Sequence, residues 1–113
     1  MEQKSLYNRF IKCEWPQQLG NLASTLARLS SLITDADYDK ISKGLLREAT
    51  LLIEWCASNI PQRLHNDLAF MQRELCCWRR VPLSAEIRNL LSLRCQIMSD
   101  HLLDISGLLS DNK

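Results

Sequence analysis

Apolar residues recur every three or four positions along most of the chain, which is the spacing of one buried face of an α-helix. The pattern predicts a short helix over residues 3 to 14, longer helices over 16 to 33, 38 to 58 and 61 to 79, and a last helix that begins after Ser84. The expected buried stripes of the four long helices are, in chain order, Leu19, Leu22, Ala23, Leu26, Leu29 and Ile33; Tyr38, Ile41, Leu45, Ala49, Leu52 and Cys56; Leu64, Leu68, Met71, Leu75 and Trp78; and Ile87, Leu91, Cys95, Met98, Leu102 and Ile105.

The breaks between these helices fall at residues that begin or end helices. Each of the three prolines, Pro16, Pro61 and Pro82, can stand at the first position of a helix, where its missing N–H is not needed. Asp35 and Asp37 are expected to cap the helix that follows them, because a carboxylate accepts hydrogen bonds from the first N–H groups of a helix. Their run lacks the glycine and terminal glutamate of a calcium loop, so we expect no metal there. Gly107 is placed to end the last helix.

Composition agrees with a helical fold. The chain holds 21 leucines but only eight isoleucines, three threonines and one valine, so residues that favour strands are scarce. Four long helices joined by short loops predict an all-α, up-down antiparallel four-helix bundle with a short N-terminal helix laid across it. A length of 113 residues suits a single domain over 1–113. The alternative is a three-helix arrangement completed by a second copy of the chain.

Charge and hydropathy bear on the compartment. Fourteen basic and thirteen acidic residues leave a formal net charge of +1, so no overall field draws the chain to nucleic acid or to an anionic membrane. The first 18 residues mix acids, bases and polar residues and lack the apolar core of a signal peptide. No stretch of about 18 uncharged apolar residues follows. We therefore expect a cytoplasmic protein that does not bind membranes.

The cysteines fit the same compartment. Five cysteines, an odd number, predict reduced thiols rather than a disulfide framework. The vicinal pair Cys76 and Cys77 is neither a CxxC redox motif nor half of a zinc knuckle. Because unpaired cysteine is among the most buried residue types, both are expected to act as inert small hydrophobes.

Two of the predicted helices carry more apolar surface than the core of one bundle needs. A bundle helix requires an apolar arc of about 100° or somewhat more. The surplus residues are Leu46, Ile53, Leu51 and Trp55 in the helix over 38 to 58, and Leu90, Leu93 and Ile97 in the last helix. We expect Leu51, Trp55, Leu90, Leu93 and Ile97 to form an interface, most simply in a symmetric homodimer. The alternative is that the short N-terminal helix covers them.

Arginines concentrate in residues 73 to 94. This segment holds Arg73, Arg79, Arg80, Arg88 and Arg94 with Glu74 and Glu86, a local net charge of +3. Arg79 and Arg80 end a helix, where they complement its dipole, but their guanidinium groups also suit an anionic ligand, a nucleic-acid backbone or an acidic partner. Arg94 lies close to its helix's buried stripe, and a buried charge is costly unless paired, so we expect an ion pair with Asp67 or Glu74.

Catalytic patterns are missing. The residues three positions before His65 and His101 are Gln62 and Met98, so the Glu-x-x-His pattern of helical di-iron proteins is absent. The chain also lacks a P-loop, a nucleophile elbow and an HExxH motif. We expect no catalytic residue, metal or cofactor. We hypothesise a small cytosolic interaction or regulatory module that self-associates and presents a mixed apolar and arginine-rich surface to a protein partner, with Arg79, Arg80 and Arg94 as interface candidates beside the apolar residues. The alternatives are binding of an anionic ligand or nucleic acid through the arginines, and a small helical enzyme that acts on an anionic substrate.

Overall fold

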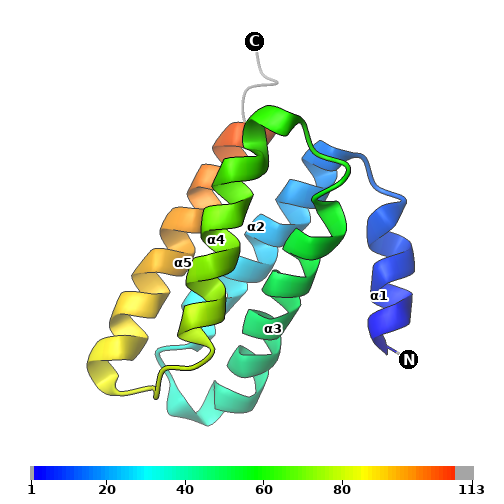
Figure 1. The fold of residues 1–113 in the computed structure, drawn as a ribbon. Coiled ribbons are helices and arrows are strands. Elements are labelled where there is room, and N and C mark those ends of the chain that lie inside the picture. Colours follow the sequence, from blue (N-terminus) through cyan, green and yellow to red (C-terminus); the bar gives the residue numbers. More distant parts are fainter. Residues whose placement is uncertain (1, 109–113) are drawn as a thin grey trace.

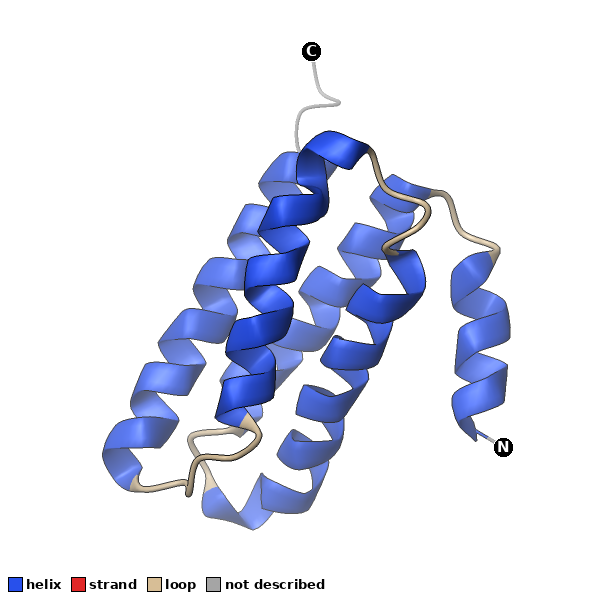
Figure 2. Cartoon of the chain, in the orientation of Figure 1, coloured by secondary structure: helices blue, strands red, loops and turns tan. Residues whose placement is uncertain are grey.

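The structure, a computed structural model, describes residues 2–108, and every regular element in that range is a helix (Figures 1 and 2). The helices are α1 (Glu2–Ile11), α2 (Trp15–Leu32), α3 (Asp39–Cys56), α4 (His65–Trp78) and α5 (Ala85–Ser106), with short 3-10 turns η1 (Ala36–Tyr38) and η2 (Gln62–Leu64). Helices α2 to α5 lie alongside one another and alternate in direction (Figure 1). The predicted all-α class is confirmed, and the arrangement is compatible with the predicted up-down bundle.

The ends of α5 have the expected caps. The side chain of Ser84 accepts a hydrogen bond from the N–H of Ile87 at 3.3 Å, which satisfies one N–H group that the first turn leaves unpaired. Gly107 ends the helix with φ of 80°, a left-handed conformation that a side chain would disfavour. Both boundary residues of this helix were predicted correctly.

The ends of α3 and α4 differ from the prediction. The carboxylate of Asp35 accepts a hydrogen bond from the N–H of Asp37 at 2.9 Å and so caps η1. Tyr38 precedes α3 and offers no side-chain cap, so the expectation that Asp37 caps the long helix is wrong. Pro61 likewise precedes η2, and α4 begins only at His65. Before α4, a 3-10 turn takes up Gln62 to Leu64, which the pattern assigned to the α-helix. Before α3, η1 takes up only Tyr38 of the predicted helix.

The core contains most of the predicted stripes, with one helix rotated. In α2, Leu19, Leu22 and Leu26 are fully buried. Tyr38, which ends η1, and Ile41 of α3 were predicted to be buried but are 43% and 47% exposed. Two residues expected to be surplus are buried instead, Leu46 at 5% and Ile53 at 4% exposed. The buried side of α3 is therefore turned toward Leu46 and Ile53, because α3 has apolar residues on both flanks and its own pattern does not fix which flank faces α2.

Hydroxyl groups join α2 to α5. The hydroxyl of Ser30 donates to the carbonyl of Ser92 at 2.7 Å, and the hydroxyl of Ser92 donates to the carbonyl of Ser30 at the same distance. Ser99, 3% exposed, donates to the carbonyl of Ala23 at 2.8 Å. Side chains this small let the two helix backbones approach closely, and α2 packs extensively against both α5 and α3.

Helix α1 packs against α3, as Figure 1 shows. The rings of Tyr7 and Trp55 meet edge to face with centroids 5.1 Å apart, and Phe10 lies 6.1 Å from the same indole. The side-chain amide of Gln18 donates to the carbonyl of Phe10 at 3.1 Å. Helix α1 therefore covers part of the side of α3 that carries Trp55, where Leu51 is also half-buried. These two surplus apolar residues are thus partly covered within one copy of the chain.

Candidate functional site

Four large apolar side chains are exposed on the outer side of α4 and α5. Phe70 is 65% exposed, and Leu90, Leu93 and Ile97 are 48%, 57% and 45% exposed. Phe70 and Ile97 line one shallow hollow of about 190 Å³ between the two helices. We call these four residues the α4–α5 face. Sequence reasoning found the three residues of α5 but missed Phe70, although its position outside the stripe of α4 was a usable signal.

An ion pair links the two helices beside this face. Arg94 donates to both carboxylate oxygens of Glu74, from Nε at 2.8 Å and from a terminal nitrogen at 2.7 Å. The indole N–H of Trp78 donates to the same carboxylate at 3.0 Å. The predicted pairing of Arg94 with an acid of the facing helix is confirmed. The hydrogen bonds from Arg94, together with that from Trp78, hold the pKa of the Glu74 carboxyl below its ordinary value.

This ion pair predicts a pH-dependent contribution to stability. Because folding lowers the pKa of Glu74, the contribution is complete above the carboxyl's unfolded pKa, about 4.3, and is lost as the pH falls through the lower folded pKa. Both side chains are partly exposed, so we expect Glu74→Gln to cost about 1 kcal/mol at pH 7 and less at pH 3. Urea unfolding of the original chain and of the variant at pH 7 and pH 3 measures this cost. A cost that is the same at both pH values would contradict the prediction.

The arginines of residues 73 to 94 do not form one cluster. Arg88 donates to both oxygens of Asp39 at 2.6 and 2.7 Å and to the carbonyl of Ile33 at 3.0 Å. The guanidinium of Arg73 lies over the ring of Phe70, 5.4 Å from its centroid. Arg88 and Arg94 are thus neutralised by acids. Arg79 and Arg80, at the C-terminal end of α4, are exposed and make no ion pair among residues 4–108.

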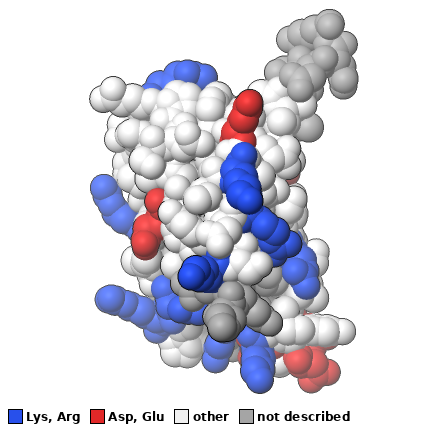
Figure 3. Space-filling model, turned by 90° about the vertical axis from the view of Figure 1, so that its right-hand side faces the viewer, with Lys and Arg blue, Asp and Glu red and all other residues white. Residues whose placement is uncertain are grey.

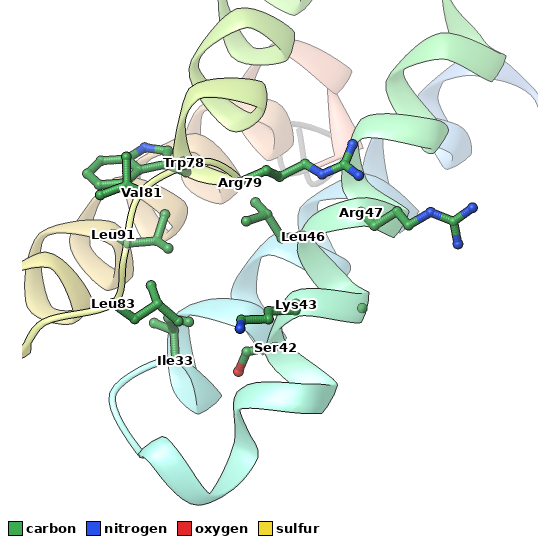
Figure 4. A pocket seen from close by; sticks show the side chains of 11 residues that line it. Ile33, Ser42, Lys43, Leu46, Arg47, Trp78, Arg79, Val81, Leu83 and Leu91 are labelled. Carbon is green, nitrogen blue, oxygen red and sulfur yellow. The ribbon is translucent and has the colours of Figure 1, made fainter.

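Arg79 instead lies at a cavity between α3 and α4. This cavity has a volume of about 400 Å³ and includes Lys43 of α3 at its rim. In Figure 4, Arg79 extends from the end of α4 toward α3, Leu46 and Leu91 point toward each other across the cavity, and Arg47 points away from it. Lys43 and Arg79 also line an adjoining, more polar hollow of about 340 Å³ that reaches Arg80. Sequence reasoning missed Lys43, because nothing in α3 marks it out from the other exposed lysines.

Basic side chains are also common on the side of the molecule where α1 lies. Seen from that side, the surface shows more Lys and Arg than Asp and Glu (Figure 3). Within α1 and the turn after it, Lys4, Arg9 and Lys12 are exposed. Helix α1 packs on α3, away from α5, so this basic surface is separate from the α4–α5 face.

Four of the five cysteines fall into two groups, and Cys13 is half-buried. Cys56 and Cys95 are buried, and desolvation raises the pKa of their thiols to about 11 and about 12, so neither is a thiolate at neutral pH. Cys76 and Cys77 are exposed on α4. The prediction that this pair is buried as small hydrophobes is wrong, because the stripe from Leu68 to Leu75 takes the inner side of α4 and leaves the two cysteines outside it.

No group of three or more His, Cys, Asp or Glu side chains within the described range is placed to hold a metal ion. Of the helices described, none combines the length and the apolar content that crossing a bilayer requires. Comparison with known protein families, with curated proteins and with solved structures found no match.

Proposed function

We propose that the protein is a self-associating interaction module in which the α4–α5 face binds the same face of a second copy. The observation that carries this proposal is the exposure of Phe70, Leu90, Leu93 and Ile97 together on one side of a small domain. Phe70 and Ile97 line one hollow, and Leu90 and Leu93 share the helix face of Ile97 by their spacing. Exposed apolar groups of this kind are typical of interfaces, and two-fold dimers are the commonest oligomers. The domain then functions as a dimeric scaffold that presents its remaining surface to a protein partner.

The order of residues along α5 supports a second copy as the occupant. In a two-fold interface the same pairs of residues meet twice. If two α5 helices cross antiparallel at the point between Leu93 and Arg94, Leu90 lies opposite Ile97 of the other copy. Glu86 then lies opposite His101, whose imidazole N–H is a donor for the carboxylate. The apolar pairs of Leu90 with Ile97 therefore flank the crossing point, at which Leu93 lies opposite Arg94 of the other copy, and complementary polar residues meet at both ends.

The ion pair beside the face also favours dimerisation. Burying an unpaired charge in an interface is costly, because the charge loses its water without gaining a partner. Arg94 is already bound to both oxygens of Glu74 within one copy. Association therefore brings an already compensated charge, rather than an isolated one, to the crossing point of the helices.

We expect Leu93→Lys to weaken self-association about tenfold or more. Leu93 is next to the proposed two-fold axis, so two introduced ammonium groups meet each other and the nearby Arg94 in an apolar contact. Because Leu93 is 57% exposed in one copy, the substitution leaves the fold intact. Sedimentation equilibrium over a range of micromolar concentrations measures the dimer dissociation constant.

Ile41→Lys is the matched control. Ile41 is 47% exposed but belongs to α3, outside the α4–α5 face. This variant should dimerise as the original chain does. A monomeric original chain at micromolar concentration, or equal weakening by both variants, would rule the proposal out.

We also propose a cytoplasmic location. None of the cysteines among residues 4–108 is in a disulfide, although Cys76 and Cys77 are exposed. Exposed vicinal thiols of this kind persist where the redox buffer is reducing. Measuring the thiol content of the protein as isolated from its source cells tests this, and Cys76 or Cys77 oxidised in a disulfide with another molecule would argue against it.

A further inference from the structure

The cavity between α3 and α4 has an apolar lining. Its walls come from the end of α2, from α3, from the end of α4, from the α4–α5 connection and from α5, and are formed by Ile33, Leu46, Trp78, Val81, Leu83 and Leu91. Its volume of about 400 Å³ lies within the range of small-molecule sites, about 300 to 1,000 Å³. The cavity can therefore take up the apolar body of a small ligand (Figure 4).

A buried hydroxyl group in this lining has no partner. Ser42 is 0% exposed, and its Oγ makes no hydrogen bond with any described residue. The other buried serines differ, because the hydroxyls of Ser30, Ser99 and Ser106 each donate to a carbonyl. A buried polar group without a partner is uncommon and destabilising, so Ser42 marks a position where a ligand atom would complete the bonding.

Two cations stand at the rim of the same cavity. Lys43 is the neighbour of Ser42 in α3, and Arg79 reaches toward α3 from the end of α4 (Figure 4). Neither forms an ion pair among residues 4–108. The nearest acid of the adjoining hollow, Asp39, already has both oxygens bound to Arg88. Lys43 still interacts electrostatically with Asp39, but this one acid faces Lys43, Arg79, Arg80 and Arg88 around the hollow, so the rim keeps an excess of positive charge.

From these contacts we propose that the cavity binds a small amphipathic anion. Its aliphatic or aromatic body occupies the apolar lining, and its carboxylate or phosphate head binds Lys43 and Arg79 at the rim. The hydroxyl of Ser42 donates to the head or to a polar atom next to it. The apolar lining excludes a bare inorganic anion as the preferred ligand, because such an ion would leave these walls unfilled. The two rim cations likewise discriminate against a neutral apolar molecule.

Titration of the full chain with octanoate tests this site, with acetate and 1-octanol as the head-only and body-only probes. The readout is the indole N–H resonance of Trp78, which lines the cavity, with Trp15 and Trp55, which do not line it, as internal references. We expect octanoate to shift the Trp78 resonance saturably and to bind about tenfold or more tightly than either other probe. Octyl phosphate in a parallel titration distinguishes a phosphate head from a carboxylate.

Four variants assign the contacts. Lys43→Gln and Arg79→Gln should each weaken octanoate binding about tenfold, as expected for the loss of a charged hydrogen bond. Ser42→Ala should weaken it about fivefold while raising the Tm of the unliganded protein, since the substitution removes an unpaired hydroxyl. Lys40→Gln is the control, because Lys40 is an exposed lysine of α3 that does not line the cavity.

Three results would overturn the proposal. The first is no saturable shift of the Trp78 resonance with octanoate or octyl phosphate. The second is equal affinity for octanoate and 1-octanol, which would show that the rim cations contribute nothing. The third is equal weakening by Lys40→Gln and Lys43→Gln, which would reduce the effect to general electrostatic attraction.

Discussion

Replacing Leu26 with alanine is expected to lower the free energy of unfolding by about 3 kcal/mol. Leu26 is 0% exposed in α2, the helix that packs against both α3 and α5. Alanine would remove the buried side chain and leave a void that close-packed neighbours on both sides cannot fill. A loss of this size is a large part of the 5 to 15 kcal/mol that stabilises a typical domain. Urea unfolding followed by far-UV circular dichroism measures it.

The half-buried Leu32 of the same helix provides the comparison for this measurement. Leu32→Ala removes the same atoms from a position that water already reaches, so the expected cost is less than half as large. A loss at Leu26 no greater than that at Leu32 would mean that the centre of the core has been wrongly placed.

Ser99→Leu is also expected to lower the free energy of unfolding by about 3 kcal/mol, but because it adds volume to the core rather than removing it. Ser99 is 3% exposed between α5 and α2, and its hydroxyl donates to the carbonyl of Ala23 at 2.8 Å. A leucine would force the two helices apart, which typically costs about 1 to 3 kcal/mol, and would also lose the hydrogen bond, worth about 1 kcal/mol.

Ser99→Ala separates the two contributions. Alanine loses the hydrogen bond but fits the space, so its cost should be about 1 kcal/mol. Unfolding of both variants under the same conditions gives the difference. If leucine proved no more costly than alanine, α2 and α5 would have room between them, and the close approach assigned to the serines would be incorrect.

The sequence predicted the buried side of a helix well where the apolar residues of that helix lie on one side only. In α2 and α4 they form single stripes, and these are buried as predicted except for Trp78 at the end of α4, which is half-buried. In α3 both flanks are apolar, so the pattern could not decide between Ile41 and Leu46, and in the structure Leu46 is buried and Ile41 is exposed. Serine has no place in a hydrophobicity pattern, so the bonds of Ser30 and Ser99 across the helices had no signal in the chain.

Some features of the candidate sites could likewise be predicted from the sequence, and others could not. Leu90, Leu93 and Ile97 could be predicted as exposed because they lie beside a complete buried stripe in their own helix. The pair of Arg94 with Glu74 followed from the cost of leaving a charge unpaired near the core. The cavity beside Ser42 could not be predicted. It depends on the spacing between α3 and α4, and residues 42 and 79 meet there only through tertiary structure.

The closeness of α2 and α5 has a consequence for how the chain reaches its native state. Ser30 and Ser92, which bond to each other's carbonyls, are 62 positions apart in the chain, and all of α3 and α4 lies between them. Closing so long a loop delays folding relative to bundles held together by neighbouring helices. During synthesis, α2 cannot pack against its main partner until α5 has emerged from the ribosome, and until then its apolar side packs mainly against α3.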